Sequence, residues 1–223
     1  MNSCSPSPSQ QNNLAIELLF QGKVAEAKAL FREAIANTKN VLGYAEYVTL
    51  VVPSSSPSPK LRGVLLPQEL KEYQARQDRC AIPMFHKVFV TPEHVGPENL
   101  DLVSASIFYN LAVTNSIGKN ECASYNLEHR LYSLSTEMLN ASGYFHDPSC
   151  CLLLLALCNN IAQSSFCDGR VDETRAALRE MLYLLESRPR DDSMEEQDVQ
   201  FFYLNTLLMK HCDQMQSICS PAA

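Results

Sequence analysis

A chain of 223 residues with 46% hydrophobic side chains is long and apolar enough to form one or two packed domains. Its 25 acidic and 18 basic side chains give a formal net charge of -7, which argues against binding to nucleic acid or anionic membranes through charge. We therefore expect a globular protein with no nucleic-acid and no membrane partner.

The opening residues 1–9 are rich in serine and proline and predict a disordered tail rather than a secretory signal. The longest apolar run, Cys150–Cys158, is shorter than the ~20 residues that span a bilayer and predicts a buried helix. Nine cysteines without a secretory signal are most simply reduced core residues. We expect a cytoplasmic protein, with a nuclear location left open.

The stretch Asn12–Ala36 has the pattern of two amphipathic helices joined by a tight turn at Gly22. Apolar residues recur there at three- and four-residue spacing: Leu14, Leu18 and Leu19 before the turn, and Ala27, Leu30, Phe31, Ala34 and Ile35 after it. Two helices joined by ~3 residues pack antiparallel and leave an apolar face for a neighbouring hairpin to cover.

The stretch 41–96 breaks the helical rhythm and is interpreted as an insertion. Tyr44–Val52 and Met84–Val90 are rich in aromatic and β-branched residues and end at prolines, which predicts two strands paired as a β-ribbon. A Ser/Pro-rich loop, Pro53–Pro59, and a short helix, Pro67–Arg79, are expected between them. A two-stranded ribbon is marginally stable alone, so we expect it to lie against the helices.

Helical periodicity returns after the insertion, at Leu100–Ile117 and Ala123–Asn140. A third pair of helices surrounds Gly169 and repeats the spacing of the first. Asn160, Ile161 and Ala162 are followed, at the offsets of the first hairpin, by Gly169, Val171, Glu173, Thr174 and Leu178. A final helix, 194–218, is expected to cap the array or to open an incomplete fourth repeat.

The first hairpin resembles the tetratricopeptide repeat. The matching residues are Leu14, Ala15, Gly22 seven residues after Ala15, Val24, Glu26, Ala27, Phe31 and Ala34. The resemblance implies a mainly α fold: an α-solenoid of helical hairpins, with the small two-stranded β insertion between the first and second hairpins. It also implies one domain over residues 10–218 that acts as a noncatalytic scaffold for protein–protein interaction.

An asparagine precedes the Leu-Ala or Ile-Ala pair in each hairpin, at Asn13, Asn110 and Asn160, and Asn205 is a fourth candidate. In stacked repeats this position can face the concave groove formed by the first helices. Asparagine offers a donor and an acceptor, so it can bind the backbone of an extended peptide whatever the sequence. Some tetratricopeptide proteins are similar in using an asparagine ladder. The alternative is a partly exposed polar residue that satisfies loop carbonyls.

Motifs for catalysis are lacking, and we predict no catalytic residue, no metal and no cofactor. His146, Cys150 and Cys151 lie close in sequence, but there is no CxxC pair, and Cys151 and Cys158 lie about 10 Å apart along a helix. Three alternatives stay open. The chain could be a self-associating structural protein that dimerises through its terminal helix, a thiol-based enzyme, or a scaffold that binds through its convex face while the ribbon covers the groove.

Overall fold

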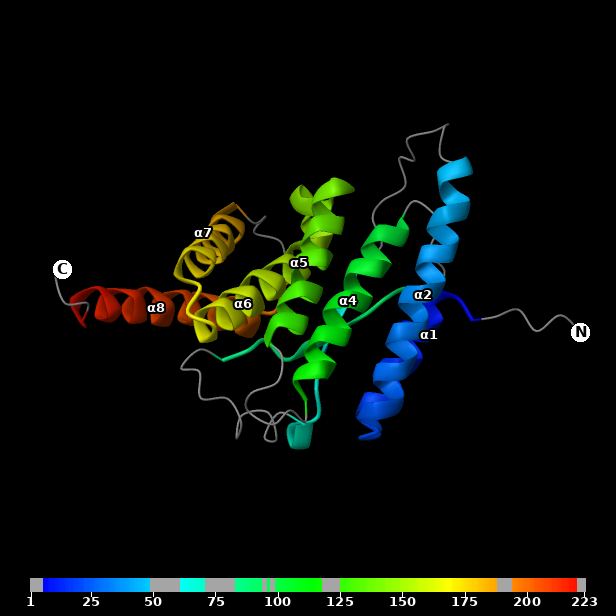
Figure 1. The fold of residues 1–223 in the computed structure, drawn as a ribbon, viewed down its shortest axis with the longest axis horizontal. Helices are drawn as coiled ribbons and strands as arrows, with labels where there is room; N and C mark the ends of the chain where they lie inside the picture. The colour runs from blue at the N-terminus through cyan, green and yellow to red at the C-terminus, as the bar shows by residue number, and fades with distance from the viewer. Residues whose placement is uncertain are drawn as a thin grey trace, which may run out of the picture.

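The computed structural model describes residues 6–48, 61–70, 83–93, 96, 99–117, 125–187 and 194–219. Over these residues the chain is mainly α-helical with one small antiparallel sheet, which confirms the predicted fold class. Figure 1 shows the helices following one another across the molecule from the blue N-terminal helices to the red α8. The expected Ser/Pro-rich loop lies outside the described residues, and so does the expected helix Pro67–Arg79 apart from residues 67–70.

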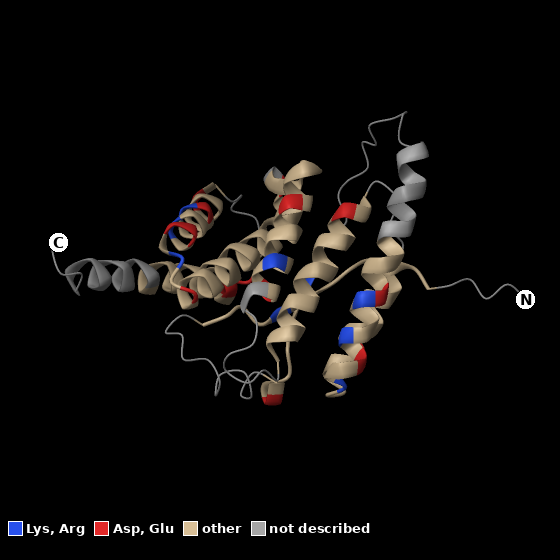
Figure 2. Cartoon of the chain, in the orientation of Figure 1, with Lys and Arg blue, Asp and Glu red and all other residues tan. Residues whose placement is uncertain are grey.

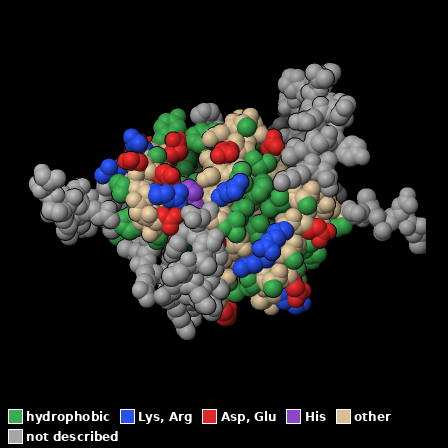
Figure 3. Space-filling model, viewed as in Figure 1, with side chains coloured by type: hydrophobic (Ala, Val, Ile, Leu, Met, Phe, Trp, Pro, Cys, Tyr) green, Lys and Arg blue, Asp and Glu red, His purple; other side chains and the backbone are tan. Residues whose placement is uncertain are grey.

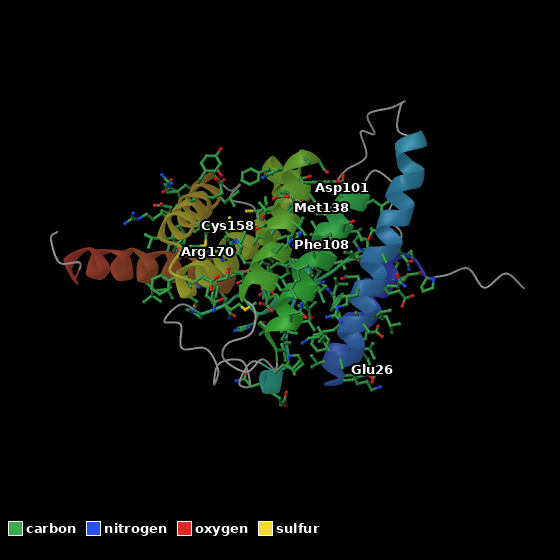
Figure 4. All side chains as sticks on the ribbon, viewed as in Figure 1. Glu26, Asp101, Phe108, Met138, Cys158 and Arg170 are labelled. Atoms are coloured by element: carbon green, nitrogen blue, oxygen red, sulfur yellow. The ribbon has the colours of Figure 1, made fainter. Side chains whose placement is uncertain are left out.

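The helices pair as hairpins that stack into a solenoid. The pairs are α1 (Pro8–Phe20) with α2 (Val24–Val48), α4 (Leu100–Ser116) with α5 (Tyr125–Ala141), and α6 (Cys151–Cys167) with α7 (Val171–Ser187). Neighbouring hairpins meet where α2 packs on α4 and α5 packs on α6, and the last helix, α8 (Glu196–Cys219), packs on α7 and α6. Phe108 of α4 and Met138 of α5, labelled in Figure 4, pack against the core.

Glycine ends the first helix of the first and third hairpins in the same way. Gly22 and Gly169 have φ of +75° and +72°, a conformation that costs other residues energy. At each turn two N–H groups donate to the end of the preceding helix: Gly22 to Leu19 (2.9 Å), Lys23 to Leu18 (2.9 Å), Gly169 to Phe166 (3.1 Å) and Arg170 to Ser165 (2.8 Å). This is the Schellman pattern, and it explains why both hairpins share their spacing.

Helix α1 begins inside the stretch that was expected to be disordered, so that prediction is wrong for residues 7–9. The Ser7 hydroxyl accepts a hydrogen bond from the Gln10 N–H at 3.2 Å, and the Ser7 N–H donates to the Gln10 side chain at 2.9 Å. These two bonds form a capping box, and Pro8 takes the first helical position, where its missing N–H costs nothing. Ser9 is buried.

The first predicted strand, Tyr44–Val52, is also wrong, because α2 continues through Val48; residues 49–52 lie outside the described part. Once a helix has been nucleated, adding a residue costs little, and β-propensity depends strongly on context. The strand that does form is β1 (Arg62–Leu65), which pairs antiparallel with β2 (Lys87–Val90) inside the predicted strand Met84–Val90. Arg62 lies opposite Val90 and Leu65 lies opposite Lys87.

Helices α4 and α6 are buried on nearly all sides, because each packs on its hairpin partner, on a neighbouring hairpin and on β2 or the residues beside it. Within the described residues, Pro148–Cys167 is the one helical segment with the length and hydropathy of a membrane span, and 72% of its apolar window is buried inside the fold. A buried core helix passes the same test, so the segment is weak evidence for a membrane span.

Candidate peptide-binding site

Residues 83–92, which we call the central segment, contain β2 and run across the first helices of the hairpins. In Figure 1 this teal to green stretch passes behind α4 on its way to α1. Met84, Phe85, Val88 and Phe89 are each at most 4% exposed. The central segment is therefore part of the hydrophobic core as well as of the insertion.

The four asparagines singled out in the sequence, Asn13, Asn110, Asn160 and Asn205, all hydrogen-bond the backbone of the central segment. We call them the asparagine row. Three of them use both side-chain groups on one residue, the Oδ1 accepting from its N–H and the Nδ2 donating to its carbonyl. The pairs are Asn13 with Thr91 (3.0 and 2.7 Å), Asn110 with Phe89 (2.8 and 2.9 Å) and Asn160 with Phe85 (2.9 and 3.4 Å).

Asn205 of α8 makes only the donor half of this contact. Its Nδ2 donates to the Pro83 carbonyl at 3.1 Å, and proline has no N–H for the Oδ1 to accept. Asn13, Asn110 and Asn160 are thus joined by a fourth asparagine on the helix that follows the third hairpin. This places α8 where the first helix of a fourth repeat would lie. Whether the row binds a segment of another protein stays a prediction.

Three residues one position before the row also contact the central segment, and the sequence analysis did not assign them. The Asn12 Nδ2 donates to the Phe89 carbonyl at 3.0 Å, the Tyr109 hydroxyl to the Phe85 carbonyl at 3.2 Å, and the Asn159 Nδ2 to the Pro83 carbonyl at 3.3 Å. The signal was present in the doubled asparagines at 12–13 and 159–160. Burial raises the pKa of Tyr109, so its hydroxyl stays protonated as a donor.

The central segment carries one buried charge. The Lys87 ammonium lies 2.8 Å from an Asp198 oxygen and 2.7 Å from a Glu195 oxygen. Burial would lower the pKa of Lys87, but hydrogen bonds and the charges of both carboxylates outweigh it, so the pKa is raised. Burial raises the pKa of Asp198, and Lys87 offsets only part of that change. The pair is therefore costly to desolvate and needs both partners.

The first hairpin supplies the match to a known family. The family model described as Tetratricopeptide repeat matches residues 9–46. The first hairpin is therefore tetratricopeptide-repeat-like. Comparison with curated proteins and with solved structures gives no match. Tetratricopeptide repeats generally mediate protein–protein interaction and are generally noncatalytic, so a protein partner is the expectation that the repeat supports.

Two of the cysteines considered for thiol chemistry are buried within the described repeats. Cys150 and Cys158 are buried, and burial raises the pKa of each thiol to about 12, so both stay protonated near neutral pH. Cys158, labelled in Figure 4, lies within α6. Cys151 is partly buried, and the His146 side chain lies outside the described part. Among the described residues, no group of three or more His, Cys, Asp or Glu could hold a metal ion.

The charged side chains of the repeats form no continuous patch of one sign on the face that Figures 2 and 3 show, where acidic and basic residues alternate over α2, α5 and α7. At the α6–α7 turn, Arg170 pairs with Asp168 and Glu173, each at 2.8 Å. A protein partner held at this face would meet a mixed surface, so charge alone does not single it out as a docking site.

Proposed function

We propose that this chain is a noncatalytic interaction scaffold that binds an extended segment of a partner protein along the asparagine row, in competition with its own central segment. The observation that carries the proposal is the paired contact of Asn13, Asn110 and Asn160, each using a donor and an acceptor on one backbone unit. Such contacts need only a peptide backbone, so a segment from another chain can satisfy them equally well.

Occupation by the central segment sets how tightly a partner can bind. A tethered segment competes at an effective concentration that is typically in the millimolar range. The apparent affinity for a partner is then reduced by the fraction of molecules in which the row is open. A substitution that weakens the contacts of the central segment should strengthen partner binding. If the central segment were instead a permanent part of the binding site, the same substitution would weaken partner binding.

The test uses the full chain and a labelled peptide with the sequence of residues 83–92. An opened chain, Phe85→Ala/Phe89→Ala, removes two rings that hold the central segment. We expect the peptide to bind the opened chain at least about tenfold more tightly than the unmutated chain, because a released row no longer has a competitor. Fluorescence anisotropy measures binding. If opening lowers helicity, recovery of the circular dichroism signal on adding peptide is an equivalent readout.

The contribution of the row is tested within the opened chain, where internal competition no longer hides it. Adding Asn110→Ala and Asn160→Ala removes the four hydrogen bonds that these two side chains make with the bound segment, each worth about 1 kcal/mol, and should weaken peptide binding by at least about 30-fold. The matched control is Asn140→Ala, an exposed asparagine of α5, which should change nothing. Equal peptide binding by the row variant and the control would contradict the proposal.

A second candidate function is self-association through α8. Leu204, Leu207 and Leu208 are 60%, 61% and 44% exposed on one side of that helix. Counted from the aligned asparagines, the positions equivalent to Leu207 in the three hairpins are Ala15, Ala112 and Ala162, all 0% exposed. At this position a leucine side chain prevents the close approach of a neighbouring helix that alanine allows. Residues 199–209 carry no charge, so a second copy of this acidic chain meets no like-charge repulsion there.

This candidate predicts a mass that rises with protein concentration. Leu207→Glu would place a charge in the centre of the apolar stripe and should leave the chain monomeric at concentrations where the unmutated chain dimerises. Sedimentation equilibrium measures the mass, and Leu14→Glu, at a half-exposed leucine of α1, is the matched control. An unmutated chain that stays monomeric at every concentration would remove this candidate.

A further inference from the structure

The hydrogen bonds of the asparagine row fix the register of whatever segment lies on it. They bind the backbone of Phe85, Phe89 and Thr91, which are odd-numbered residues and so share one edge of the strand. The even-numbered edge faces β1, as the Leu66 N–H donating to the His86 carbonyl at 3.1 Å shows. A partner that used the same asparagines would therefore bring alternate side chains to the sites that the odd-numbered residues occupy now.

Lys87 is the odd-numbered residue between Phe85 and Thr91 whose backbone the asparagine row does not bind. Its side chain is bound instead. Its ammonium reaches Asp198 and Glu195 at the start of α8 while the whole residue is only 8% exposed. Gly63 of β1 covers its stem, since a Cβ built on Gly63 would lie 3.3 Å from the Lys87 Cδ and 3.1 Å from Leu152. The Lys87 stem therefore lies against the backbone of β1, and its ammonium ends between one buried and one exposed carboxylate; we call these surroundings the lysine channel.

Aromatic contacts flank this channel on both sides. The Phe85 ring lies 4.7 Å from the Phe202 ring and 5.4 Å from the Phe201 ring, both on α8. On the other side, the Phe89 ring meets the Tyr109 ring edge-on at 5.1 Å. A segment that fills these sites needs apolar side chains two residues before and two residues after the lysine position. Backbone hydrogen bonds alone do not meet this requirement.

We propose that the asparagine row selects partner segments with an aromatic residue, a lysine and a second aromatic residue at alternate positions. The proposal rests on the proposed function, because it names the class of segment that the row binds. Leaving Asp198 buried without a cation is expensive, so a segment with an uncharged side chain at the lysine position should bind more weakly, and one with an acidic side chain more weakly still. Backbone contacts supply attachment and the channel supplies specificity.

The test compares three ten-residue peptides with the sequence of residues 83–92, carrying lysine, methionine or glutamate at the position of Lys87, on the opened chain Phe85→Ala/Phe89→Ala. The measured quantity is the ratio of affinities between peptides, which cancels any remaining internal competition. The lysine peptide should bind at least about tenfold more tightly than the methionine peptide, and the glutamate peptide more weakly still. The same ratio measured on the unmutated chain, at higher peptide concentration, guards against a folding defect.

The matched variant adds Asp198→Asn and Glu195→Gln to the opened chain. It keeps the shape of the channel and removes its charge, so the preference for lysine should fall towards a ratio of one. Equal binding of the three peptides to the opened chain would overturn the lysine preference while leaving the proposed backbone binding intact. Failure of all three peptides to bind either chain would overturn both proposals. A lysine preference that survives removal of both carboxylates would assign the selectivity to another site and overturn this one.

Discussion

Phe89→Ala is expected to lower the free energy of unfolding by about 3–5 kcal/mol, the usual cost of truncating a fully buried phenylalanine. Phe89 is 1% exposed, its ring packs edge-on against Tyr109, and its backbone is held by Asn110. Truncation leaves a cavity between the central segment and α4 that the segment cannot fill without breaking those hydrogen bonds. Urea unfolding followed by circular dichroism at constant pH measures the change.

Phe20→Ala is the matched control, because Phe20 ends α1 with 43% of its surface exposed. Its truncation should cost less than about 1 kcal/mol, as substitutions at partly exposed positions usually do. Similar losses in the two variants would mean that the central segment is not packed into the core in solution. A loss confined to Phe89→Ala would show that the internal occupant contributes a large share of the stability of this domain, so that a partner must replace its contacts.

The helical hairpins could be predicted from the sequence because their signals are local. Gly22 and Gly169 end their helices through bonds that span a few residues, and the apolar spacing on either side is visible within one window. Asn13, Asn110 and Asn160 were recognisable for the same reason, since each directly precedes a repeated Leu-Ala or Ile-Ala pair. Equivalent positions in stacked hairpins face the same way, so a shared spacing becomes a shared surface.

What the row contacts could not be read from local patterns. Asn13 bonds Thr91 and Asn160 bonds Phe85 across 78 and 75 residues of sequence, and nothing in either neighbourhood names its partner. The same limit applies to Lys87 and Asp198, which are separated by 111 residues. The residue pattern predicted a ribbon lying against the helices, with one alternative in which it covers the groove. It could not show that the asparagines of the first helices hydrogen-bond the backbone of the second strand and its neighbours.

Two local errors have separate physical causes. The start of α1 was hidden because serine and proline indicate disorder by composition, although Ser7 and Gln10 have the spacing of a capping box. The end of α2 was misjudged because Tyr44–Val48 has β-propensity, which helix propagation overrides. The first error could have been avoided by giving the spacing of Ser7 and Gln10 more weight than the serine and proline composition. The second could not, because the choice depends on packing.

We expect burial, rather than distance, to determine how much each ion pair of Lys87 contributes to the free energy of unfolding. Lys87 reaches Asp198 and Glu195 at nearly equal distances, 2.8 and 2.7 Å, but the Asp198 side chain is 6% exposed and the Glu195 side chain is 71% exposed. Asp198→Ala should lower the free energy of unfolding by about 3–5 kcal/mol, because it leaves a buried ammonium with only a solvent-screened partner. Glu195→Ala should cost less than about 1 kcal/mol.

The decisive comparison is the double variant Lys87→Met/Asp198→Leu, measured by urea unfolding beside the two single alanine variants. Replacing both charges with apolar side chains removes the desolvation penalty together with the attraction, so most of the stability lost in Asp198→Ala should return. If the double variant stays as unstable as Asp198→Ala, the buried pair is a net source of stability. If stability returns, the Lys87–Asp198 pair contributes no net stability to the fold. That result is expected if the pair serves to select which segment binds the asparagine row.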